Sequence, residues 1–235
     1  MIDVIMQNYD QLILKIGEHL LISFLALLLG VVVAVPIGVV LVKNKKMSSF
    51  VISIASILQT IPSLALLAIM VPIFGIGKTP GVFAIFIYSL LPILRNTYLG
   101  MDGVDKDTLD AAKGMGMTFW QRIISIQVPL AAPVIMSGIR LSAVYVISWT
   151  TLASYIGAGG LGDFIFIGLN TFNIPMIVMG AVPVTILALL VDFILGKIEK
   201  FVKPKTSSFN GKKSSNQDGD ENFNNLAKDN MGEGC

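Results

Sequence analysis

The chain has 235 residues, of which 54% are hydrophobic and only 14% are charged, and its mean hydropathy is +0.77. These values lie far from those of a soluble globular domain, so the sequence predicts an integral membrane protein. The net charge of +2 gives no indication of a nucleic-acid partner. Cys235 is the one cysteine, which excludes a disulfide framework and a cysteine-based metal site.

The first predicted membrane span covers residues 20–42, which carry no charge. As a helix it would be about 34 Å long, enough to cross a bilayer. Residues 1–19 are predicted to form an amphipathic interfacial segment on the outer surface. No signal peptide is predicted, because Lys15 and Glu18 precede an apolar block that is too long for one. The cytoplasmic end of this span is marked by a lysine cluster at Lys43, Lys45 and Lys46.

The next uncharged stretch, residues 47–77, is longer than one span requires, and Pro62 interrupts it. We interpret it as one kinked helix rather than two, followed by a turn-rich outer loop at 75–80. The third span is predicted from about Pro80 to Arg95, where a long charged loop begins.

The fourth predicted span follows Pro133 and ends near Tyr155. Arg140 falls in its first turns, where a long side chain can extend to the cytoplasmic interface. A glycine-rich outer turn and a short re-entrant or interfacial helix come next, at 157–163 and 164–173. The fifth span, 174–195, is closed by cytoplasmic lysines: Lys197, Lys200, Lys203 and Lys205.

These elements predict an all-α membrane domain over residues 20–200 with five transmembrane helices, the amino terminus outside and the carboxyl terminus inside. A sixth span is possible if the Pro62 region splits. A cytoplasmic loop at 96–130 separates the third and fourth spans. Residues 201–235 are rich in Ser, Asn, Lys, Gly and Asp, so they are predicted to form a disordered cytoplasmic tail.

The loop contains an amphipathic stretch, residues 107–129, that is predicted to form two short helices. Asp107 is placed to cap the first, with Asp110 in its first turn, and Gly114 and Gly116 end it. A capping box of Thr118 and Gln121 then starts the second helix. Apolar residues at helical spacing put one apolar stripe on a common side of both: Leu109, Ala112, Gly116, Phe119 and Ile123.

The spacing of this stretch resembles the cytoplasmic loop motif of ABC importer permeases, usually written Glu-Ala-Ala, three residues, Gly, nine residues, Ile, one residue, Leu-Pro. Here Asp replaces Glu and Val replaces Leu. The resemblance implies that this loop is a coupling helix that docks on an ATPase subunit. The residues implied in coupling are Asp110, Ala111, Ala112, Gly116, Phe119, Ile126 and Pro129. Met115 and Met117 are expected to give a flexible packing surface there.

Four further segments, at 59–65, 72–77, 88–97 and 156–163, resemble permeases for the quaternary-amine osmoprotectants glycine betaine, carnitine and choline. The likeness extends over roughly residues 15–200. It implies a type I ABC importer permease, a multi-pass protein of the bacterial cell (inner) membrane. Its implied partners are ABC ATPase subunits, a second permease that is identical or paralogous, and an extracytoplasmic substrate-binding protein.

Several polar or aromatic residues interrupt the otherwise apolar spans and are candidates to line a substrate pathway: Gln59, Thr60, Tyr88, Asn96, Tyr145 and Trp149. Small residues at helical spacing, such as Gly30, Gly38 and Gly138, allow close helix packing, either within the chain or at a dimer seam.

The sequence offers no catalytic constellation. The one histidine, His19, is expected to be an interfacial side chain, and the glycine run at 157–162 lacks the Gly-Lys-Ser/Thr ending of a phosphate loop. The chain is therefore predicted to be no enzyme and to bind no cofactor or metal, with ATP and Mg²⁺ held by the partner ATPase. The alternatives are a methionine-type amino-acid importer permease and, from another class, a membrane channel or scaffold protein.

Overall fold

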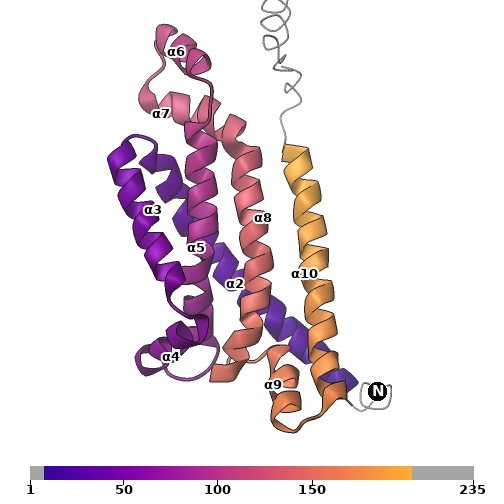
Figure 1. The fold of residues 1–235 in the computed structure, drawn as a ribbon. Coiled ribbons are helices and arrows are strands. Elements are labelled where there is room, and N and C mark those ends of the chain that lie inside the picture. Colours follow the sequence, from indigo (N-terminus) through magenta and orange to yellow (C-terminus); the bar gives the residue numbers. More distant parts are fainter. Residues whose placement is uncertain (1–7, 203–235) are drawn as a thin grey trace, which may run out of the picture. The chain divides into compact units, whose positions relative to one another are not determined.

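The computed structural model describes residues 8–202, and every regular element in that range is helical. The predictions for residues 1–7 and for the tail from residue 203 onward lie outside the described residues. The long helices are α2 (Tyr9–Leu41), α5 (Lys78–Asp102), α8 (Val128–Ala153) and α10 (Ile174–Val202). The shorter ones are α3 (Lys45–Thr60), α4 (Ser63–Phe74), α6 (Lys106–Gly114), α7 (Phe119–Arg122) and α9 (Gly162–Asn170) (Figure 1).

Four helices are long and apolar enough to cross a membrane, and α3 with α4 makes a fifth candidate span that is bent by 94°. Figure 1 shows α3 beginning at the end of the bundle that holds α6 and α7, and α4 at the opposite end. The pair thus returns the chain across the bundle once, which agrees with the five predicted spans. With 16 and 12 residues, α3 and α4 are each shorter than the roughly 20 residues of a spanning helix, so six spans are not supported.

The region around Pro62 forms two helices, so the prediction of a single kinked helix was wrong. Ile61 has extended backbone angles (φ −64°, ψ 130°) and ends α3, and α4 begins at Ser63. The proline ring disfavours helical angles at the residue before it, which accounts for the break.

Three other boundaries differ from those expected. Helix α2 begins at Tyr9, so residues 9–19 continue into the first span and form no separate interfacial helix. Helix α5 runs past Arg95 to Asp102, and α8 starts at Val128, before Pro133. Residues 96–102 and 128–130 of the predicted loop are therefore helical extensions of the spans.

The charges of α2 that suggested a separate segment are paired at the outer end of the bundle. Glu18 accepts from the Lys78 ammonium at 2.8 Å and from the backbone N–H of Gly160 at 3.2 Å, and Lys15 bridges Glu18 and Asp163. His19 is buried, with Nε2 donating to the Ile147 carbonyl oxygen at 3.0 Å, so the expected interfacial placement was wrong. These contacts connect α2 to α5, α8 and the glycine-rich turn.

Small residues pack the long helices against one another within the chain. A Cβ added at Gly30 would lie 2.1 Å from Ser89 Oγ, and one at Gly38 would lie 2.7 Å from Thr97 Cβ, both on α5. A Cβ added at Gly138 on α8 would lie 2.5 Å from Asn96 Cβ. At these positions the small residues serve intramolecular packing rather than a dimer seam.

Basic residues collect at the end of the bundle that carries α6 and α7. They come from the α2–α3 connection, from α6 and α7, and from the last turns of α10: Lys43, Lys45, Lys46, Lys106, Lys113, Arg122, Lys197 and Lys200. By the positive-inside rule this end faces the cytoplasm. The amino-terminal end of α2 then lies outside, as predicted.

Candidate coupling and translocation sites

The first candidate site is the coupling segment, which we define as residues 105–127 between α5 and α8. Asp105 caps α6 by accepting the Thr108 N–H at 3.0 Å, and this bond lowers the pKa of its carboxyl from the ordinary 3.8. The cap predicted at Asp107 was therefore two residues too late: Asp107 occupies the first turn, and Asp110 lies in the next one.

The junction between the two short helices has the predicted chemistry. Helix α6 ends at Gly114, and Gly116 adopts φ +80°, a left-handed conformation that side chains other than glycine rarely take. Thr118 and Gln121 form the expected capping box: the Thr118 N–H donates to Gln121 Oε1 at 2.8 Å, and the Gln121 N–H donates to Thr118 Oγ1 at 3.4 Å.

A π-helical turn at Ile123–Gln127 joins α7 to α8. Pro129 has no N–H to donate, and its ring conflicts with the carbonyl four residues earlier, which a wider turn relieves. The Val128 N–H accordingly bonds to the Ile123 carbonyl, five residues back. Gln127 is buried and donates to the Met101 carbonyl oxygen at 3.5 Å, so the turn contacts the end of α5.

Part of the predicted apolar stripe of the coupling segment, Phe119 and Ile123, packs on the membrane helices of the same chain, whereas Gly116 in that stripe is exposed. Ala112 and Ile123 are buried, and half-buried Phe119 packs on the cluster of Met101 and Ile123, with Lys43 Nζ 5.9 Å from its ring centroid. Of the other motif residues, Ile126 is half-buried, and the rest are exposed: Asp110, Ala111, Gly116 and Pro129.

A second set of apolar side chains on this segment points away from the bundle and was mostly missed. Met115, Trp120 and Ile124 are 75%, 56% and 67% exposed. Only Met115 was singled out from the sequence. The available signal was that Trp120 and Ile124 fall outside the helical stripe yet are large and apolar, which is unusual for a solvated loop.

The second candidate site is an aromatic cluster between α5 and α8. Tyr88 and Trp149 have ring centroids 4.6 Å apart, and Tyr145 and Trp149 have centroids 5.6 Å apart. The Tyr88 hydroxyl donates to the Ile61 carbonyl oxygen at the α3–α4 break. The structure thus joins three of the predicted pathway residues. Gln59 and Thr60 are the two residues before Ile61, whose carbonyl Tyr88 contacts.

Asn96 lies apart from that cluster. Its side-chain amide donates to the Pro92 carbonyl oxygen of its own helix at 2.8 Å, and its Cβ packs beside Gly138. Thr60 also bonds within its own helix, to the Ile57 carbonyl oxygen at 2.7 Å.

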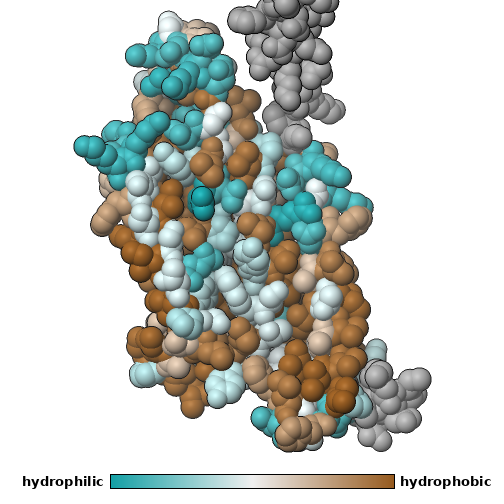
Figure 2. Space-filling view, in the orientation of Figure 1, coloured by the Kyte–Doolittle hydropathy of each residue, from teal (hydrophilic) through white to brown (hydrophobic). Residues whose placement is uncertain are grey.

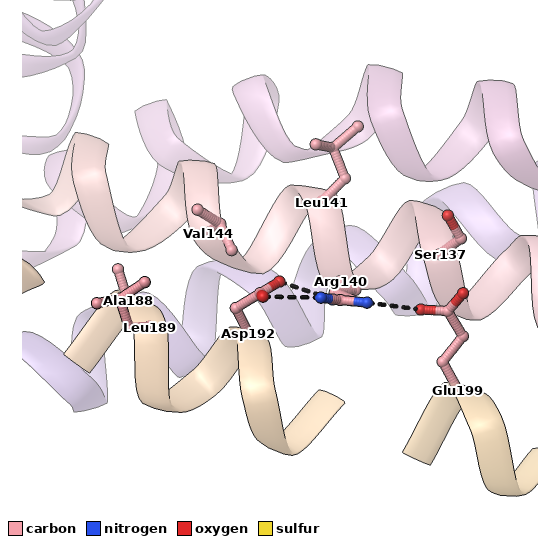
Figure 3. A pocket seen from close by; sticks show the side chains of 8 residues that line it. All are labelled: Ser137, Arg140, Leu141, Val144, Ala188, Leu189, Asp192 and Glu199. Carbon is pink, nitrogen blue, oxygen red and sulfur yellow. Dashed lines mark hydrogen bonds and ion pairs between the residues drawn. The ribbon is translucent and has the colours of Figure 1, made fainter. Parts of the chain in front are cut away.

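A third feature, a charged cluster between α8 and α10, was not predicted (Figure 3). Arg140 binds Asp192 through two hydrogen bonds of 2.6 and 2.7 Å and Glu199 through one of 3.2 Å. Gly196 leaves room for the guanidinium, which lies 3.0 Å from where its Cβ would be. Beyond the expected reach of Arg140 toward the cytoplasmic interface, the structure pairs its guanidinium with acids of α10, as is usual for charges within a span.

This cluster lines an open cleft of about 500 Å³ between the two helices, formed also by Ser137, Leu141, Val144, Ala188 and Leu189. A sequence signal existed: Asp192, Gly196 and Glu199 recur on one face of the last span.

Figure 2 shows weakly polar colours over the middle of the visible face, where α5 and α8 lie, between apolar surfaces over α3, α4 and α10.

Five candidate crossings, a cytoplasmic segment capped by its own hydrogen bonds, and a weakly polar strip along the central helices describe a multi-pass membrane protein. Among the described residues no group of His, Cys, Asp and Glu could hold a metal ion. Residues 26–205 match the model of the binding-protein-dependent transport system inner membrane component, and the chain belongs to this family. The channel or scaffold alternative is thereby set aside.

Relatives in the family are closely similar along most of their length. The chain is 56% identical over 187 residues to a carnitine transport permease protein of Listeria monocytogenes, covering 80% of this chain and 86% of the relative. It is 53% identical over 193 residues to a glycine betaine/carnitine/choline transport system permease protein of Bacillus subtilis, covering 82% and 89%.

Among solved structures, the fold is similar to a chain of the inward-facing MetNI methionine ABC transporter. The TM-score is 0.77 at 23% identity, over 83% of this chain and 98% of that one. The likeness supports the predicted type I importer permease fold. Family membership makes this chain the multi-pass, non-catalytic inner membrane component of an ABC importer, and it implies an ATPase and a binding protein as partners.

Proposed function

We propose that this chain is the permease subunit of an ATP-driven importer for quaternary-amine osmoprotectants, among them glycine betaine, carnitine and choline. The observation that carries the proposal is the 53–56% identity, over about four-fifths of the chain, to permeases named for these compounds. The amino-acid transporters whose fold is similar are only 21–23% identical, so they support the fold and not their substrates.

Energy enters through the coupling segment. Phe119 and Ile123 hold it against α5 and α8, and the exposed apolar side chains of Met115, Trp120 and Ile124 are free to dock in a groove of the ATPase. Exposed apolar patches of this kind are characteristic of protein interfaces. Movement of the docked segment is transmitted to α5 through the Gln127–Met101 contact and to α8 through the π-helical turn.

Transport follows an alternating-access cycle. ATP binding draws two ATPase subunits together, the docked segments of two permeases approach each other, and the spans open outward to receive substrate from an extracytoplasmic binding protein. Hydrolysis restores the inward-facing state. The second permease is a copy of this chain or a paralogue, and α10 offers it a largely exposed apolar surface.

The substrate pathway runs along the central helices. The aromatic residues Tyr88, Tyr145 and Trp149 lie toward its outer half, since α8 runs from the cytoplasmic end at Val128 to the outer end at Ala153. Gln59 and Thr60 stand at the α3–α4 break beside them, and Asn96 lies nearer the cytoplasmic end of α5.

The test is uptake of labelled betaine, carnitine and choline by vesicles that hold the chain with its co-purified ATPase, partner permease and binding protein. ATP-dependent accumulation of at least one compound is expected, with none when ATP is replaced by a non-hydrolysable analogue. Uptake of methionine but of no quaternary amine would overturn the substrate assignment and leave the importer assignment intact. Failure of any ATPase to co-purify would contradict the assignment of the coupling segment.

A further inference from the structure

The three rings of the aromatic cluster differ in their exposure to solvent. Tyr88 is 4% exposed, Trp149 is half-buried and Tyr145 is 41% exposed. The planes of Tyr145 and Trp149 are inclined by 33°, and those of Tyr88 and Trp149 by 47°. Trp149 therefore contacts two aromatic rings, one buried inside the bundle and one exposed at its surface.

The buried part of the cluster is held in place. The Tyr88 hydroxyl satisfies the Ile61 carbonyl oxygen, which the helix break leaves without an intrahelical partner. The space beside Tyr88 and Trp149 is only about 10 Å³, and it is also lined by Ser63, Leu67, Ala84, Ile85 and Leu152. A ring packed this closely does not rotate to suit a ligand, so the Trp149 ring is preorganised.

The accessible part of the cluster lies on the exposed stripe of α8. Exposed residues recur at helical spacing along that helix: Ser137, Leu141, Tyr145 and Ser148. Leu141, one turn from Tyr145, also lines the cleft that holds the Arg140 cluster. That cluster combines one guanidinium with the carboxylates of Asp192 and Glu199, a formal charge of −1. A cation at Tyr145 is thus one turn from a cleft of negative formal charge.

A trimethylammonium group carries a positive charge but has no N–H to donate. Proteins recognise such groups by placing them over the faces of aromatic rings, and Trp is the strongest of these partners. We infer that Trp149 and Tyr145 form a cation–π subsite that receives the trimethylammonium group of the substrate on its way through the permease.

Weak binding suits this role, because a pathway must release what it receives. One or two ring faces without a full cage give an affinity that allows onward movement toward the cleft. The inference rests on the proposed function, since it is the quaternary-amine relatives that suggest this cation.

The experiment replaces Trp149, in the assembled complex, with tryptophans carrying one to four fluorine atoms. Fluorination lowers the negative charge of the ring face stepwise and leaves the shape nearly unchanged, so a packing role would not follow the series. The initial rate of ATP-dependent uptake should fall stepwise, by on the order of tenfold over the series, for betaine, carnitine and choline alike. The matched control is a fluorinated phenylalanine series at Phe83, whose ring stacks on Phe74 with centroids 4.6 Å apart and lies outside the proposed subsite, where uptake should not change.

The outcomes separate the two claims. If the unsubstituted complex takes up a quaternary amine and the Trp149 series leaves the rate unchanged, the subsite is overturned and the proposed function stands. A fall confined to choline would also overturn it, because all three substrates share the trimethylammonium group. If the unsubstituted complex takes up none of them, the proposed function fails, and the subsite with it.

Discussion

The α2–α5 contact and the coupling segment are built on opposite principles. The contact depends on missing side chains: Gly30 and Gly38 let two long helices approach until an added methyl group would overlap Ser89 or Thr97. The coupling segment depends on local hydrogen bonds, with Asp105 and Thr118 as caps and Gly116 as a left-handed joint. Changes in the first should therefore disturb the whole bundle, and changes in the second should alter coupling while the spans stay folded.

The largest effect is expected from Gly30→Leu. Its first carbon alone would lie 2.1 Å from Ser89 Oγ, and overpacking of a close helix contact destabilises by about 1–3 kcal/mol or more. The melting temperature of the purified chain in detergent should fall clearly. Gly17→Ala on the same helix is the control, because a Cβ there meets nothing within 4 Å and alanine favours the helix. Equal melting temperatures for the two variants would contradict the close-packing argument.

A smaller loss is expected when the contact between α8 and α10 is broken. Arg140→Gln leaves Asp192 and Glu199 without their cation, and a double-mutant cycle with Asp192→Asn should give a larger interaction energy than an exposed single ion pair does. The same cycle on Lys45 and Asp102, an exposed pair 3.9 Å apart, should give less than about 1 kcal/mol. Denaturant titration in micelles measures both, and similar values would show that the Arg140 cluster is no more than a surface pair.

In the coupling segment, Gly116→Leu should uncouple transport without unfolding the spans. Leucine at φ +80° is strained by about 1–2 kcal/mol, although its Cβ would meet nothing within 4 Å. Strain in the backbone, rather than a clash, should shift the joint and lower the amount of substrate imported per ATP. Gly114→Leu, two residues earlier and without a positive φ, should preserve that ratio. A normal ratio in Gly116→Leu would refute the role of the joint.

Truncation of the exposed apolar side chains of the coupling segment should also impair transport, but by less than Gly116→Leu does. Trp120→Ala removes a 56%-exposed ring that contacts Phe119, with ring centroids 5.6 Å apart, so its loss should weaken ATPase docking severalfold and leave the melting temperature almost unchanged. Ile76→Ala, an exposed apolar truncation at the opposite end, is the control. Docking is measured by co-purification and by titration of the ATPase onto the reconstituted permease.

The smallest effect is a local dependence on pH. The Thr108 N–H lowers the pKa of Asp105 in the folded chain, so this cap stabilises α6 above the ordinary pKa of 3.8 and is lost as pH falls through the lower folded value. The Thr108 amide resonance should move in this acidic range, and in Asp105→Asn, which keeps the acceptor but cannot titrate, it should not. Movement of the Thr108 resonance in both the unsubstituted chain and Asp105→Asn would assign the change to another group.

Local features were predictable because neighbouring residues decide them. The capping box at Thr118 and Gln121 and the end of α6 near Gly114 depend on residues three or four apart, and the apolar blocks specify the crossings by length alone. The cap at Asp105 was misplaced because three aspartates within six residues compete for that position, and only the backbone angles of the Gly103–Asp105 turn select one of them.

By itself, the sequence determined the membrane class, the orientation of the spans and the position of the coupling segment, whereas the choice of five crossings over six needed the lengths of α3 and α4. Only the tertiary structure decided which face of that segment remains free, that Arg140 meets Asp192 52 residues later, and that Tyr88, Tyr145 and Trp149 meet across two helices. The reason is physical: hydropathy and caps act over one or two turns, whereas the rotation and spacing of long helices follow from close contacts such as Gly30 with Ser89 and Gly138 with Asn96, which no local pattern specifies.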